Sequence, residues 1–373
     1  MKLHKHIHHH SKQNPLLSFT ILVSTAALIT LLVTSGATIF AQARSIFLEL
    51  ESGSRTSVAE KSSSSASGGK YVQFSNGADS TPATPDPDPP PPDPDPDPDP
   101  EPTPASWQSA WDTRNYNTIR SWYRNNTGIK ATGLTDADLT PSGSISSTSD
   151  GQVIEGLLVT GSINIKHKNV TVRNTKVVNS GNTIAINVSY SNRDVVNKFT
   201  VENVSLIGTG DDTEFRQALG GTYAPVYVKR VYIDGFGGGI RLSHENGDTV
   251  EYSMVENIRT HPGSHNTAIS TRGGNNKTIT HNWFEGSTSS ALSLYPDASA
   301  ITNLTASKNL FDGGTYSILG GDGKIYGPQS THNRFINNLF TRNYSSGPLA
   351  AFDRSIEGRE WSGNYYLDGT LIP

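Results

Sequence analysis

The sequence lacks cysteine, an excess of basic residues and, after residue 150, any helical periodicity. None of its 373 residues is Cys, which excludes a fold stapled by disulfides and requires a large, regular core instead. Residues 1–104 hold 7 of the 30 basic and 11 of the 34 acidic residues, which leaves 23 of each for residues 105–373. This neutral balance provides no global basic field, so we expect no nucleic-acid partner.

The N-terminal segment, residues 1–43, has the features of an export signal. Three lysines precede an uncharged stretch over residues 14–43. Basic residues before a long apolar run direct the following chain out of the cytoplasm. The run is long enough to span a bilayer, yet Ala41-Gln42-Ala43 also fits a cleavage site. We therefore predict an exported protein, either secreted or held in the membrane by this segment with its C-terminal domain outside.

Two further segments precede the candidate domain. Residues 44–80 are of low complexity, and a fragment at 48–77 resembles the opening strands of a sugar-binding β-sandwich module. The fragment is too short for a complete module, so we predict no sugar binding from it. Residues 81–104 contain 13 Pro in 24 positions, which is typical of a semi-rigid polyproline II spacer. A stiff spacer after an export segment predicts that residues 105–373 are displayed away from the cell surface.

Residues 105–373 contain an internal repeat. An apolar–polar–polar pattern recurs in steps of 18 to 29 residues, with marker positions at 156, 174, 203, 230, 252, 281, 308, 337 and 363. Short β-branched and aromatic runs separated by Gly and Asn favour a parallel β-solenoid of about nine coils. Residues 106–125 have apolar residues at helical spacing, and we expect them to form a short helical cap over the N-terminal end of the solenoid.

Four longer motifs resemble those of a known superfamily. They are "NNTGI…LTPSGSI" (125–145), "GSHNTAIST…NNKTITHNWFEG" (263–286), "ITNLTASKNLFDGGTYSILGG" (301–321) and "GPLAAFDRSIEGREWSGNYYLDGTLIP" (347–373). They resemble bacterial secreted right-handed parallel β-helix proteins of the pectin-lyase-like superfamily. The resemblance implies an all-β, right-handed parallel β-helix. It does not select an activity, because this fold hosts polysaccharide lyases, hydrolases, epimerases and proteins without known activity.

A second strand in each coil predicts a ligand-binding face. Its alternation points Ile186, Ile240, Ile269, Leu292 and Ile318 inward and the next residue of each coil outward. Small residues at 185, 239, 268 and 291 would give a flat floor. Arg241 and Arg272 could meet sugar carboxylates or sulfates. The remaining candidates are Tyr295 for stacking on a sugar ring and His244, His265, Asn187, Ser270 and Ser293 for polar contacts.

The residues leave three functions open. The first is binding of a polysaccharide, with an acidic one favoured by the two arginines. The second is a polysaccharide lyase in which Arg241 and Arg272 neutralise a uronate and His265 removes the α proton. The third is an adhesion or structural module without glycan chemistry. Thr267 stands where the resemblance implies an Asp, which favours binding over catalysis. We expect a monomer and see no evident cofactor, although carboxylates from separate coils could converge on Ca²⁺.

Overall fold

The computed structural model describes residues 59–62, 70–73, 105–211, 216–220, 223–260, 266–322 and 327–373. The chain divides into two compact units, residues 1–99 and residues 100–373. In the first, β1 (Ala59–Ser62) pairs antiparallel with β2 (Lys70–Gln73). The predicted export segment and Pro-rich spacer lie outside the described residues. No described helix is both long enough and apolar enough to cross a membrane.

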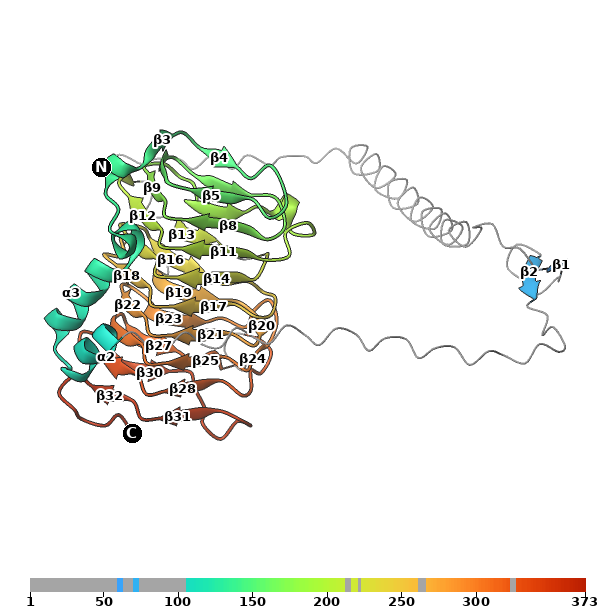
Figure 1. The fold of residues 1–373 in the computed structure, drawn as a ribbon. Coiled ribbons are helices and arrows are strands. Elements are labelled where there is room, and N and C mark those ends of the chain that lie inside the picture. The colour runs from blue at the N-terminus through green and yellow to red at the C-terminus, as the bar shows by residue number, and fades with distance from the viewer. Residues whose placement is uncertain are drawn as a thin grey trace, which may run out of the picture. The chain divides into compact units, whose positions relative to one another are not determined.

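The second unit is an all-β parallel solenoid built from three sheets (Figure 1). Sheet I contains β3 (Thr140–Ser142), β6 (Leu157–Thr160), β9 (Lys176–Asn179), β12 (Ser205–Gly208), β15 (Tyr232–Asp234), β18 (Met254–Glu256), β22 (Trp283–Gly286), β26 (Leu310–Gly313), β29 (Leu339–Phe340) and β32 (Tyr365–Tyr366). Sheet II contains β4 (Ile145–Ser146), β7 (Ile163–Ile165), β10 (Ile186–Val188), β13 (Gln217–Gly220), β16 (Gly238–Arg241), β19 (Thr267–Thr271), β23 (Ser290–Leu294), β27 (Tyr316–Leu319) and β30 (Gly347–Ala350).

Sheet III completes each turn before the chain returns to sheet I. It contains β5 (Val153–Glu155), β8 (Val170–Arg173), β11 (Phe199–Glu202), β14 (Val226–Lys229), β17 (Thr249–Glu251), β21 (Thr278–Thr280), β25 (Thr305–Ser307), β28 (Arg334–Ile336) and β31 (Glu360–Ser362). A short extra pair, β20 (Gly274–Asn275) and β24 (Ile301–Thr302), lies between sheets II and III in two neighbouring coils. The predicted solenoid is thus confirmed.

The repeat positions coincide with the turn between sheets III and I. All nine marker residues have positive φ: Gly156, Asn174, Asn203, Arg230, Tyr252, His281, Lys308, Asn337 and Gly363. This left-handed conformation explains the recurrence of Asn and Gly in the marker column. The solenoid has about seven turns, against the nine coils predicted. Sheets II and III each contain nine strands, of which the first and the last pair with a neighbour on one side only.

Period-2 alternation fills the core as predicted. Ile186, Ile240, Ile269, Leu292 and Ile318 are all buried and belong to one continuous hydrophobic cluster. A ladder of amides runs parallel to it: Asn282 donates to Asn309, Asn309 to Asn338, and Asn338 to Asn364, at 2.9 to 3.1 Å. All four side chains are fully buried, so the ladder satisfies the polar groups of the turn inside the solenoid.

The predicted helices are present, but their position differs from the prediction. α2 (Ala105–Asp112) and α3 (Tyr116–Asn126) lie across the outer face of sheet I rather than over the N-terminal end of the solenoid (Figure 1). The reason is an outward apolar row on sheet I, which needs a cover. Trp107 and Tyr123 are buried against that row, which includes Met254, Trp283 and Leu310.

Candidate functional site

The predicted ligand face of sheet II forms one aligned row. Strand register places Asn187, Gly220, Arg241, Ser270 and Ser293 side by side across neighbouring coils. Asn187 and Arg241 are partly exposed. Ser270 and Ser293 are only 6% and 0% exposed, so their side chains are buried rather than presented on the surface. The Ser293 hydroxyl instead makes a hydrogen bond to Ser290 within its own strand.

Arg241 is the cation of this row that has no acid partner. No ion pair joins it to a described carboxylate, and its Nε is buried without a hydrogen-bond acceptor in the described part of the chain. Burial lowers the pKa of Arg241, and the neighbouring charge of Arg272 lowers it further. Arg241 is partly exposed, so an anion at this surface can pair with its guanidinium charge, with which no described carboxylate forms an ion pair.

Arg272 occupies the turn after β19 and is already neutralised. Its Nε donates to the Asp297 carboxylate at 2.7 Å, and its Nη2 contacts the same carboxylate. This hydrogen bond raises the pKa of Arg272 and lowers that of Asp297. Thr271 pairs with Leu294 at the end of β19, and Arg272 and Tyr295 are the residues that follow this pair in the two coils. Because its charge is paired with Asp297, Arg272 offers an anion a weaker direct contact than Arg241 does.

His244 follows β16 and lies among these cations. Its Nε2 is buried and has no hydrogen-bond partner in the described part of the chain. Burial lowers the pKa of His244, and the charges of Arg272 and Arg241 act in the same direction. The imidazole is thus held in its neutral form near neutral pH.

The remaining candidates are placed differently. Tyr295 is partly exposed, and its hydroxyl lies 3.2 Å from the Ser289 hydroxyl. The small residues predicted as a surface floor belong to the core instead: Ala185, Ala268 and Ala291 are 0% exposed, and a Cβ at Gly239 would meet Val255 of sheet I. His265, the predicted base, lies outside the described residues.

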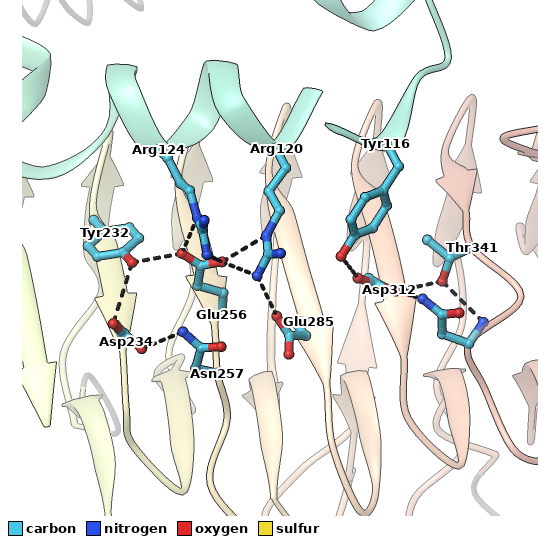
Figure 2. A network of polar contacts seen from close by, with 11 residues as sticks. Tyr116, Arg120, Arg124, Tyr232, Asp234, Glu256, Asn257, Glu285, Asp312 and Thr341 are labelled. Atoms are coloured by element: carbon cyan, nitrogen blue, oxygen red, sulfur yellow. Dashed lines mark hydrogen bonds and ion pairs between the residues drawn. The ribbon is translucent and has the colours of Figure 1, made fainter. Parts of the chain in front are cut away.

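A second polar feature, not predicted from the sequence, lies on sheet I beneath α3. Four outward carboxylates from neighbouring strands form an acid row: Asp234, Glu256, Glu285 and Asp312 (Figure 2). Arg120 and Arg124 of α3 both donate to Glu256, at 2.7 to 3.1 Å, and the Tyr232 hydroxyl donates at 2.7 Å. In the sequence, the acid row is marked by a recurring pattern of two apolar or aromatic residues followed by an acid: YID, MVE, WFE and LFD.

The acid row anchors α3 to sheet I. Asp312 accepts hydrogen bonds from Tyr116, Thr341 and Asn343, and Glu256 is fully buried among its donors. Glu285 and Asp312 also line an open hollow of about 750 Å³, together with Tyr116 at the start of α3. Burial raises the pKa of Glu285, whose Oε2 has no hydrogen-bond partner within the described ranges.

No protein-family model, no curated protein and no solved structure matches this chain. Within the described residues, no group of three or more His, Asp or Glu side chains is arranged to hold a metal ion.

Proposed function

We propose that the chain is an exported, surface-displayed β-solenoid that binds an acidic polysaccharide through the surface around Arg241. The observation that carries this proposal is the pairing pattern of the two arginines. Arg272 has its carboxylate in Asp297, whereas Arg241 has a buried Nε without an acceptor in the described part of the chain. A sugar carboxylate or sulfate that reaches the partly exposed side chain of Arg241 supplies the anionic partner that Arg272 already has in Asp297.

The solenoid is suited to a polymer because it repeats the same surface coil after coil. Asn187 lies two coils before Arg241 in the same row and is a second partly exposed polar side chain. A carbohydrate chain lying along the row would meet Asn187 and Arg241 two strand spacings apart, about 10 Å. Export and display rest on the charge pattern of residues 1–43 and on the Pro-rich spacer. Protein with an N-terminus at Arg44 would support cleavage after Ala43, and an intact N-terminus would support a membrane anchor.

A binding screen of the full chain tests the proposal. Calorimetric titration with polygalacturonate, alginate and hyaluronan is compared with titration by dextran, a neutral polymer. Binding of at least one acidic polymer, lost or strongly weakened in Arg241→Gln, supports the proposal. The matched control is Arg334→Gln, which removes an arginine already paired with Glu360 on sheet III. Equal binding of dextran, or binding by Arg241→Gln at wild-type strength, would refute it.

A second candidate, β-elimination on a uronate, is favoured by one observation. His244 is a partly exposed imidazole whose lowered pKa keeps it neutral, beside the cation that would neutralise the uronate. In such a reaction the imidazole takes the proton α to the carboxylate, and the leaving oxygen departs as a new C=C bond forms. The same panel detects it through ultraviolet absorbance of the unsaturated product. Binding without absorbance leaves the polysaccharide-binding proposal alone.

A further inference from the structure

Three aromatic rings occupy the same place in three successive coils. Tyr190 begins the 3₁₀ turn Tyr190–Asn192 after β10, Tyr223 follows β13, and His244 follows β16. Each lies three residues beyond a member of the sheet II row, namely Asn187, Gly220 and Arg241. Equivalent positions in stacked coils are vertical neighbours, so the rings form a strip along the solenoid axis, which we call the aromatic strip.

Ring geometry confirms the alignment. The ring centroids of Tyr190 and Tyr223 are 5.4 Å apart, and those of Tyr223 and His244 are 6.4 Å apart. The ring planes are inclined by 77° and 68°, so each ring meets its neighbour edge to face. The strip ends at His244, three residues beyond Arg241 in the same coil. The aromatic strip and the anion site therefore form one continuous surface.

Core packing does not account for the whole strip. Tyr223 packs partly against the core, but Tyr190 is 61% exposed and is among the most exposed large apolar side chains of the described residues. The Arg193 guanidinium lies over the Tyr190 ring at 3.9 Å, yet a single cation covers one face only. Tyr190 therefore presents an aromatic side chain to solvent in line with two further rings, and tyrosines with one apolar body and one polar end are enriched at interfaces.

We propose that the aromatic strip extends the Arg241 site and binds successive sugar rings of one linear polysaccharide. The polymer lies along the solenoid axis, with an anionic sugar at Arg241 and the preceding rings against Tyr223 and Tyr190. Pyranose rings present apolar C–H faces that stack on aromatic rings, whereas their hydroxyls remain in water. This inference rests on the proposed function and narrows it: the ligand is an oligomer long enough to span several coils, not a single acidic sugar.

Chain-length dependence tests the inference. The full chain and its Tyr190→Ala/Tyr223→Ala variant are titrated with a dimer and an octamer of the acidic polymer that binds in the panel. We expect the variant to bind the octamer about tenfold more weakly and the dimer unchanged. Arg241→Gln should weaken both oligomers. Tyr227→Ala, which removes a 37% exposed tyrosine from sheet III, is the matched control, and circular dichroism with thermal denaturation verifies that each variant is folded.

Each outcome separates the inference from the proposed function. Wild-type affinity of the double tyrosine variant for the octamer overturns the aromatic strip, even where Arg241→Gln loses binding. Loss of octamer binding in the tyrosine variant with normal binding by Arg241→Gln supports the strip and refutes the anchor at Arg241. Failure of the wild-type chain to bind any acidic polymer overturns both.

Discussion

Lys277 and Asp248 form an ion pair in which neither side chain is exposed to solvent. The Lys277 ammonium also donates to the backbone carbonyls of Ser243 and Glu245, both at 2.9 Å. Asp248 in turn accepts from the Ser243 hydroxyl at 2.7 Å. The pair therefore fixes the two residues that flank His244, and the position of the imidazole beside Arg241 depends on a charge pair inside the solenoid.

Breaking this pair should strongly destabilise the solenoid. Lys277→Met leaves the Asp248 carboxylate buried without its cation, and we expect the free energy of unfolding to fall by about 3–5 kcal/mol. Urea denaturation of the variant measures the loss. The control is Arg334→Gln, whose ion pair with Glu360 is exposed and should be worth about 1 kcal/mol or less. Similar losses in both variants would contradict the structural role of the buried pair.

His281 should make the helical cover sensitive to acid. Its ring stacks on Tyr252 at 4.8 Å and meets Trp107 of α2 at 4.5 Å. Burial, reinforced by the charge of Lys308, lowers its pKa from 6.5 to about 4. The unfolded chain therefore binds a proton that the folded chain does not between these values, so stability falls as the pH falls from 6.5 to about 4.

The variant His281→Asn tests this pH dependence. Asn tolerates the positive φ of this position and has no charge to gain. We expect the free energy of unfolding of the wild type, relative to that of the variant, to decline steadily as the pH is lowered from 6.5 to about 4. Urea denaturation at several pH values measures this difference. A constant difference between the two proteins would show that the His281 imidazole does not titrate in this way.

The amide ladder should contribute measurably to the stability of the solenoid. Asn309 donates to Asn338 and to the backbone carbonyl of Ile279, and accepts from Asn282. Asn309→Ala leaves buried partners unsatisfied, so we expect a loss of about 1–3 kcal/mol, read from thermal or urea denaturation. Asn125→Ala, on the exposed surface of α3, should change stability by a few tenths of a kcal/mol at most. A loss at Asn125 that equals the loss at Asn309 would contradict the ladder.

The sequence predicted the solenoid well because its signals are local. A left-handed turn needs Gly, Asn or a tolerant polar residue, and the nine marker positions revealed the spacing of the coils without any knowledge of their packing. Alternation along each short strand likewise identified inward residues such as Ile240 and Ile269.

The prediction was less accurate where several elements meet. The amphipathic pattern of residues 106–125 predicted helices, but only the outward row of Met254, Trp283 and Leu310 shows which surface they cover. Ser293 was predicted to be exposed because alternation gives direction and not accessibility. The acid row was missed because its members are far apart in sequence and become neighbours only through strand register.

The affinity of Arg241→Gln for an acidic polysaccharide tests the central claim most directly. Wild type, Arg241→Gln and Arg334→Gln are titrated by calorimetry with the panel polymer that binds the wild type. We expect Arg241→Gln to bind about 10–100-fold more weakly, because the sugar anion loses its charged donor, and Arg334→Gln to bind like wild type. Wild-type affinity in Arg241→Gln, or equal weakening in both variants, would contradict the proposal that Arg241 is the anchor for the anionic sugar.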